Sequence, residues 1–191
     1  SIESIQVQRG VGTSTNGPAA FGGSINILTN AASDKPSFEI NNTLGSFNTV
    51  KNSVGFSTGF INDKFEFSGR LSRIKSGGYI DRSGSKLRSY FLQGIYKDEN
   101  TLLKILNFAG HEITDQAWFG IDSSTLEINR KYNPAGEYYD KMGNTRYYNN
   151  QDDNYKQDHY QFHWNQSYEN GWISNLGLHY TYGRGYWENY N

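Results

Sequence analysis

Hydrophobic and polar residues alternate with a period of two along most of the chain, whereas the 3.6-residue period of an amphipathic helix is almost absent. Near the start, Ile2, Ile5 and Val7 mark one short strand, and Ile25 and Ile27 mark a second. The later predicted strands are longer and cover 38–44, 50–60, 64–71, 87–97, 101–111, 158–168 and 172–183. Because period-two alternation places apolar side chains on one face of a sheet, the sequence predicts an all-β fold.

The Asn-Asp dipeptide at 62–63 predicts a tight hairpin between two of these strands. A two-residue loop at this position pairs Phe60 with Phe65. Further along the strands, the same register pairs Phe56 with Gly69. The apolar residues of both strands then share one face.

The sequence YENGW, which starts at Tyr168, predicts a three-residue loop in which Gly171 adopts the left-handed conformation of a G1 bulge. This loop pairs Tyr168 with Trp172. It also pairs Trp164 with Leu176, so that the apolar residues of both strands lie on the same side. A two-residue Asn-Gly turn would put them on opposite faces, so we expect the longer loop.

Strand lengths and connection lengths favour part of a large antiparallel transmembrane β-barrel. About 9 to 11 tilted residues cross a bilayer, and several predicted strands have this length. The predicted connections are short at 60–65, 97–101 and 168–172 but long at 75–87 and 112–157, and a short one at 45–49 is an exception. Short turns on one side and long loops on the other are typical of outer-membrane barrels. The alternative is a soluble β-sandwich that serves in binding or adhesion, with its aromatic face buried against a second sheet.

Composition narrows the possible functions. Aromatic residues make up 16% of the 191 residues, which argues against disorder although hydrophobic residues make up only 35%. The net charge of −1 gives no basic excess for nucleic acid. The absence of cysteine excludes disulfides and thiolate metal sites. No stretch has the roughly 20 apolar residues of a membrane helix. No nucleophile motif such as G-x-S-x-G occurs, so we expect neither enzymatic activity nor a cofactor.

The segment IESIQVQRGVGTSTNGPAAFGGSINILTN contains a strand ending in Arg-Gly, a Gly/Ala/Ser-rich loop, a Gly-Gly pair and a final strand of the I-N-I-x-T kind. This order resembles the C-terminal end of the plug domain of TonB-dependent outer-membrane receptors. The later segments GHEITDQAWFGI, RKYNP and DDNYKQDHYQ resemble a subset of that family. The resemblance implies that 1–30 end a plug domain, that 31–37 are a linker, and that 38–191 form the first seven or so strands of a barrel. The family total is 22 strands, so the chain would be part of a longer protein, with 112–157 as an extracellular loop.

The resemblance also implies a function. Receptors of this family lie in the Gram-negative outer membrane, bind a scarce small-molecule nutrient at the extracellular face, and import it with energy from a TonB-type transducer in the inner membrane. Arg9 matches the plug arginine that carboxylates of the barrel wall hold, and those partners would lie on later strands. Gly10, Gly17, Gly22 and Gly23 match the plug loop. The expected ligand is a ferric siderophore or a haem-type compound, with an oligosaccharide as the second choice.

The predicted loop 112–157 carries more aromatic residues than a solvated loop needs. Tyrosine gives a large contact area at low entropic cost, so these rings are candidates for substrate contact. The rival interpretation is that the rings pack against one another within the loop. The run NNQDDN is a weaker candidate for calcium. The ring candidates are Trp118, Phe119, Tyr138, Tyr139, Tyr147 and Tyr148.

Two further hypotheses concern metals and phosphate. The four histidines, His111, His159, His163 and His179, suggest a metal or haem site, but His159 and His163 lie about 13 Å apart along one strand face. Polar residues that line a barrel lumen are the simpler interpretation, and no metal site is expected. The glycines after Arg9 suggest a phosphate-binding loop, but that loop needs a helix after it, and a strand follows instead.

Overall fold

In a computed structural model of the protein, residues 2–10, 22–29 and 32–190 are described. The chain divides into two compact units, Ser1–Ser33 and Asp34–Asn191, and the division falls inside the predicted linker 31–37. Among the described residues, no helix has the length and apolar character needed to cross a membrane.

The first unit is a two-stranded antiparallel hairpin of β1 (Ile2–Arg9) and β2 (Gly23–Thr29). Arg9 lies opposite Gly23 at one end of the ladder. Beyond this pair, the N–H of Gly10 donates to the carbonyl of Gly22 at 3.0 Å. Gly10 has a φ of +80°, a left-handed conformation that glycine adopts without steric cost. The predicted plug-loop residue Gly17 lies outside the described residues.

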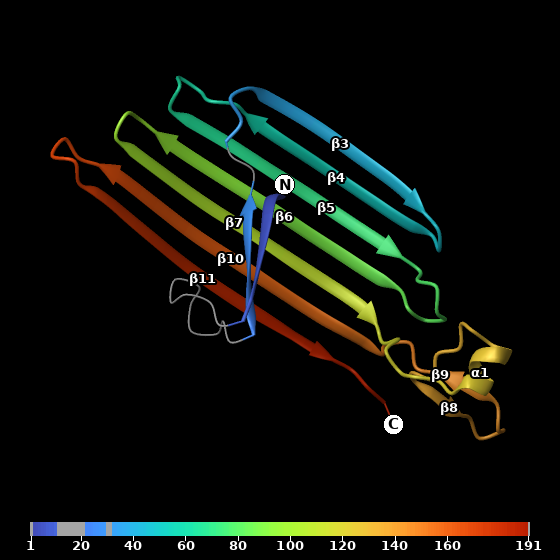
Figure 1. Cartoon of the computed structure of the whole chain (residues 1–191). Helices are drawn as coiled ribbons and strands as arrows, with labels where there is room; N and C mark the ends of the chain where they lie inside the picture. Colours follow the sequence, from blue (N-terminus) through green and yellow to red (C-terminus); the bar gives the residue numbers. More distant parts are fainter. Residues whose placement is uncertain (1, 11–21, 30–31, 191) are drawn as a thin grey trace. The chain divides into compact units, whose positions relative to one another are not determined.

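The second unit contains a large antiparallel sheet in the order β11-β10-β7-β6-β5-β4-β3 (Figure 1). Every neighbouring pair is antiparallel. Its edge strands, β3 and β11, do not pair with each other within the part of the chain that the structure describes. The all-β prediction and the large antiparallel sheet are therefore confirmed. The strands are β3 (Pro36–Gly45), β4 (Thr49–Thr58), β5 (Phe65–Ser76), β6 (Ser85–Lys97), β7 (Thr101–Asp115), β10 (Asp152–Ser167) and β11 (Ile173–Trp187).

The predicted loop between β10 and β11 is confirmed in detail. The N–H of Tyr168 donates to the carbonyl of Trp172 at 2.9 Å, and Gly171 has a φ of +82°. The ladder pairs Trp164 with Leu176, as the three-residue loop requires. The strand faces therefore follow from the loop length that the sequence predicts.

The predicted turn between β4 and β5 is only partly right. The ladder pairs Phe56 with Gly69, as expected. Near the turn, however, Phe65 forms a bridge with Ile61 and not with Phe60. Gly59 precedes this bridge with a φ of +64°, so the chain changes direction before the turn and the pairing moves by one residue.

The pairing gives the large sheet two different faces. The face that we call aromatic carries rings and aliphatic side chains that remain largely exposed, such as Phe38 at 69% and Ile105 at 59%. The opposite, polar face includes the buried residues Ser53, Glu66 and Gln93. Since partners across antiparallel strands share a face, the register alone assigns each residue. The aromatic face includes Phe38, Phe56, Phe67, Leu92, Ile105 and Phe162.

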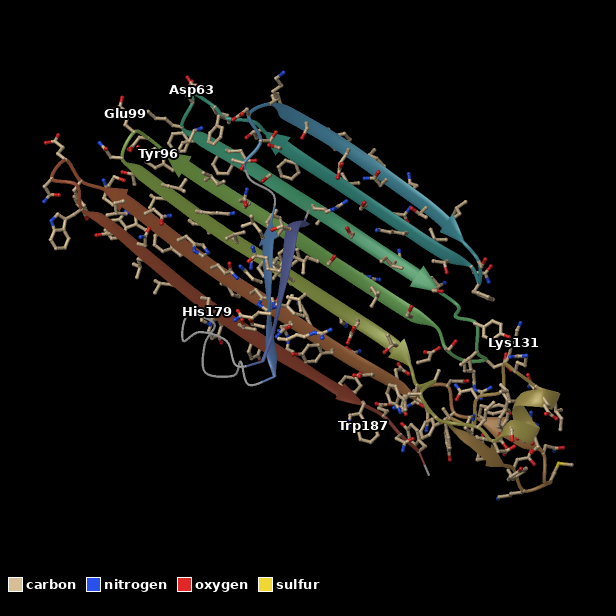
Figure 2. The ribbon with its side chains drawn as sticks, viewed as in Figure 1. Asp63, Tyr96, Glu99, Lys131, His179 and Trp187 are labelled. Carbon is tan, nitrogen blue, oxygen red and sulfur yellow. The ribbon has the colours of Figure 1, made fainter. Side chains whose placement is uncertain are left out.

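The connections differ at the two ends of the sheet. The turn residues Asp63 and Glu99 lie together at one end, whereas Lys131 lies in a larger structure at the other (Figure 2). This second end carries the connection 77–84 and the connection 116–151, together with the short turn at 46–48. As predicted, the short turns lie at one end of the sheet and the long connections at the other, and the short turn at 46–48 is the expected exception.

The predicted long loop is shorter and more regular than expected. β7 continues to Asp115 and β10 begins at Asp152, so the loop covers 116–151 and not 112–157. It contains α1 (Ser123–Ile128), β8 (Glu137–Tyr139) and β9 (Thr145–Tyr147). The Asp122 side chain caps α1 by accepting from the N–H of Thr125 at 2.7 Å.

Candidate functional site

Three segments meet beyond the long-loop end of the sheet: 77–84, 116–151 and 188–190. We call this structure the loop lobe. Asn133 joins the first two segments, because its side-chain amide donates to the carbonyls of Asp81 at 3.0 Å and Gln116 at 2.9 Å. Asn133 is only 2% exposed, so these bonds are shielded from water. Arg82 donates to the carbonyl of Asn133 in return.

Two buried glutamines connect the lobe to the end of β11. The N–H of Gln116 donates to the carbonyl of Gln151 at 3.0 Å, and its side chain donates to the carbonyl of Glu188 at 2.6 Å. The side chain of Gln151 donates to the carbonyl of Tyr190 at 3.2 Å. The lobe is therefore held mainly by side-chain bonds to backbone carbonyls and not by an apolar core.

Three tyrosine rings pack against one another in the lobe, and we call them the stack. The ring centroids of Tyr138 and Tyr148 are 4.5 Å apart, and those of Tyr148 and Tyr190 are 4.7 Å apart. Tyr138 is 37% exposed, so the stack keeps an open face. Aromatic pairs at such separations stabilise the packing of the segments that carry them.

Glu137 organises a second group of tyrosines. Its carboxylate accepts from the hydroxyls of Tyr132 at 2.6 Å and Tyr147 at 3.2 Å. The hydrogen bond to Glu137 is the largest cause that raises the pKa of Tyr132 to about 12, since the charge of the carboxylate opposes a phenolate. The guanidinium of Arg82 lies 3.5 Å above the ring of Tyr147. Glu137 therefore holds the hydroxyl of Tyr147, and Arg82 covers its ring.

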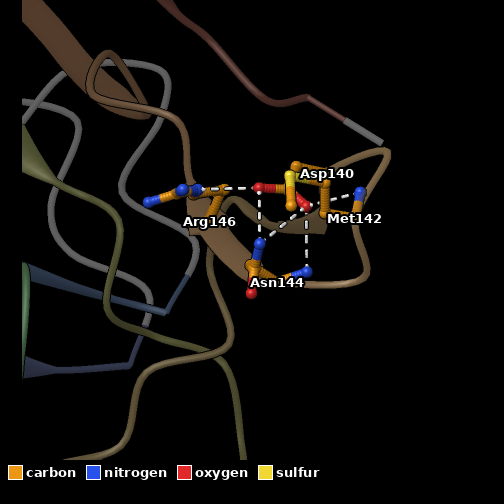
Figure 3. A network of polar contacts seen from close by, with 4 residues as sticks. All are labelled: Asp140, Met142, Asn144 and Arg146. Carbon is orange, nitrogen blue, oxygen red and sulfur yellow. Dashed lines mark hydrogen bonds and ion pairs between the residues drawn. The ribbon is translucent and has the colours of Figure 1, made fainter.

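Asp140 closes the turn between β8 and β9 (Figure 3). One carboxylate oxygen accepts from the N–H groups of Met142 and Asn144, both at 2.9 Å. The other oxygen pairs with Arg146 at 3.1 Å. These hydrogen bonds, above all that from the backbone of Asn144, hold the pKa of Asp140 below its ordinary value. The network explains how a hairpin with strands of three residues each keeps its form.

The six predicted ring candidates fall into two sets. Tyr138 and Tyr148 belong to the stack, and Tyr147 belongs to the group around Glu137. Trp118, Phe119 and Tyr139 are 60%, 43% and 69% exposed, and no ring contact joins them to the others within the described residues. The hydroxyl of Tyr139 nevertheless donates to Glu137 at 3.5 Å. The rings thus both pack within the loop and present open surface, so each of the two interpretations describes part of the lobe.

The four histidines do not form one site. His111 lies on the aromatic face, opposite Lys156, whereas His159, His163 and His179 lie on the polar face. His159 stacks on Phe108 at 4.5 Å. Within the described residues, no group of three or more histidines and carboxylates is arranged to hold a metal ion.

The predicted plug residues have local structural reasons for their identity. Gly23 lies so close to the facing strand that a Cβ atom would come within 2.8 Å of the carbonyl oxygen of Gln8. Gly22 has open space around it and supplies the carbonyl that Gly10 contacts. Arg9 is exposed at the end of β1, and its role as an anchor stays a prediction.

Several lobe residues escaped prediction, namely Arg82, Gln116, Asn133, Glu137 and Asp140. Their importance depends on contacts between distant segments, which a single sequence does not reveal. Only the Asn-Pro pair at 133–134 marked a turn.

A comparison of the sequence with models of known protein families finds no matching family, and a search of curated proteins finds no match.

Proposed function

We propose that this chain is part of a TonB-dependent transporter of a Gram-negative outer membrane. The observation that carries the proposal is the exposed aromatic face of a sheet whose strands have 10 to 16 residues. Water makes so large an apolar surface unfavourable, whereas lipid acyl chains would cover it. The short turns at one end and the loop lobe at the other also support a membrane strand array.

The soluble β-sandwich is the weaker candidate. It needs a second sheet of similar size to cover the aromatic face. Within residues 34–190, the second sheet is β8 and β9, with three residues in each strand. Residues 34–190 therefore contain no second sheet large enough to bury this face.

In the proposed transporter, the seven strands form one wall of a barrel that further strands close. The hairpin of β1 and β2 ends the plug, and the loop lobe contributes to nutrient capture on the extracellular side. The exposed rings of Trp118 and Tyr139 suit a large, partly flat ligand, which supports a ferric siderophore or haem-type compound over an oligosaccharide. Import would draw on energy that a TonB-type protein delivers from the inner membrane.

Two experiments test the proposal. The native full-length protein should fractionate with the outer membrane and require detergent to stay monomeric, and a stable monomer in detergent-free buffer contradicts the membrane assignment. Nutrient uptake by whole cells should stop when the proton-motive force is dissipated. Uptake that continues without it indicates a passive porin instead.

A further inference from the structure

A row of basic residues crosses the aromatic face. The register places Arg73 directly opposite Arg88, Arg88 opposite His111, His111 opposite Lys156, and Lys156 opposite Arg184, over the five strands from β5 to β11. We call these five residues the basic row. One step further toward the loops, Lys75 lies opposite Lys86. Like charges directly opposite in a sheet are destabilising, so the pairs Arg73–Arg88, Lys75–Lys86 and Lys156–Arg184 require a compensating gain.

The protein neutralises only part of this row. Asp158 accepts from Arg184 at 2.6 Å and lies 3.9 Å from the ammonium of Lys156. His111 contacts the side chain of Asn154 at 3.0 Å. In the described parts of the chain, neither Arg73 nor Arg88 has a carboxylate partner or a side-chain hydrogen bond. Both arginines are exposed and offer their guanidinium groups to an anion.

The basic row lies at a defined distance from the tight turns. Arg73 follows Phe65 by eight residues on β5, and Arg88 precedes Tyr96 by eight on β6. Eight residues span about 26 Å along a strand. Strands tilted by about 35–45° rise only about 20 Å over this length, so in an apolar band about 25 Å tall the row lies toward the boundary on the long-loop side.

An open hollow joins the row to the apolar surface. Its volume is about 490 Å³, and it lies along β4 to β10. One part of its lining is apolar and the other part is basic, so the hollow matches a molecule with an apolar part and an anionic part. Its lining includes Val54, Leu71 and Tyr90 on the apolar side and Arg73, Arg88 and Lys156 on the basic side.

We propose that the basic row and this hollow bind the headgroup of a phosphorylated lipid, whose acyl chains lie along the aromatic face. Arginine pairs with phosphate through two parallel hydrogen bonds, and several cations match a headgroup with more than one phosphate. The inference rests on the proposed function, because it needs the aromatic face to lie in a bilayer.

Lipid titration of the full-length protein in a zwitterionic detergent, followed by native mass spectrometry, tests this inference. Diphosphoryl lipid A is the probe, and phosphatidylcholine is the reference lipid. The variant Arg73→Gln/Arg88→Gln should bind lipid A roughly 100-fold more weakly, since each lost charge-assisted contact is worth about tenfold. The control Lys51→Gln/Arg130→Gln removes the same charge from the polar face and the loop lobe and should bind like the unchanged protein. Arg88→Lys keeps the charge but loses the paired geometry, so it should weaken binding by less than about tenfold.

Other results overturn the inference. Equal binding of lipid A and phosphatidylcholine contradicts it, and so does equal binding by both double variants. Inorganic phosphate that binds at the row and displaces no lipid shows a site for free anions instead. A heat-induced gel shift checks that each variant is folded, and Arg88→Lys supplies the test if the double variant is not. If the protein needs detergent but shows no lipid preference, only this inference fails, whereas a stable detergent-free monomer contradicts the proposed function itself.

Discussion

Gly171 ends the loop between β10 and β11 with a φ of +82°, and a Cβ atom there would meet no other atom within 4 Å. A Gly171→Ala substitution therefore introduces backbone strain without a clash. We expect it to lower the free energy of unfolding by about 1 kcal/mol. Gly120 is the matched control, because it has equally open space but no left-handed φ. Urea unfolding of both alanine variants measures the difference, and equal midpoints contradict the role of the φ angle.

Arg9 tests the plug assignment at the level of one side chain. If carboxylates of the barrel wall hold it in the proposed transporter, Arg9→Ala should loosen the plug and raise the passive entry of a hydrophilic dye into cells. Arg130→Ala removes the same charge from the loop lobe and should leave dye entry unchanged. Unchanged permeability together with unchanged nutrient uptake removes the anchoring role of Arg9.

Glu137 gives the loop lobe a pH dependence. It raises the pKa of Tyr132 from 10.0 to about 12, so the contribution of this pair to stability is complete below pH 10.0. The contribution is then lost as the pH rises toward about 12. In Glu137→Gln, the late part of the tyrosinate absorbance titration should move to lower pH. Glu127→Gln on α1 is the control, and a titration that is identical in all three proteins contradicts the pairing.

At the scale of elements, the turn end of β10 and β11 was predictable. These two strands alternate cleanly, and Gly171 selects one loop length, so their register follows from local chemistry. At the turn between β4 and β5, the pairing differs from the prediction by one residue. The opposite strand ends were not predictable. β7 runs four residues past His111 because its pairing with β6 and β10 continues, although polar residues on both faces remove the alternation.

The basic row and the loop lobe were beyond prediction for a related reason. Arg73 and Arg88 become neighbours only through the register of β5 and β6, which the connection 77–84 does not reveal. Asn133 acquires its role through backbone carbonyls 17 and 52 residues away in sequence. The ring candidates were found because composition alone marked them, but their division into two sets depends on the β8–β9 hairpin.

The β8–β9 hairpin depends on the carboxylate of Asp140. Asp140→Ala removes the acceptor for Met142, Asn144 and Arg146, so proteases should cut the segment 137–147 several-fold faster. The lowered pKa of Asp140 means that its contribution is present above pH 3.8 and is lost as the pH falls below that value. Glu169→Ala in the β10–β11 loop is the control. Equal cleavage of both variants contradicts the importance of the turn network.

At the scale of the whole molecule, the sheet poses a problem of solvation. Its aromatic face is open, and the edge strands β3 and β11 present unpaired backbone groups. Further strands of a barrel would pair with these edges, and lipid would cover the face. In a soluble protein, other parts of the structure would have to cover the aromatic face and pair with the edge strands. Residues 34–190 contain no segment that does either.

Tryptophan fluorescence in lipid bilayers separates these two cases. Trp164 lies on the aromatic face between Leu103 and Leu176, whereas Trp118 lies in the loop lobe. In liposomes whose acyl chains carry bromine, we expect strong quenching of Trp164 and little of Trp118, because bromine quenches only at short range. Iodide in the buffer should show the reverse order. Single-tryptophan variants of the full-length protein, with the other positions changed to phenylalanine, make each signal specific. If bromine and iodide quench both residues equally, the aromatic face does not contact lipid, and the outer-membrane assignment fails with it.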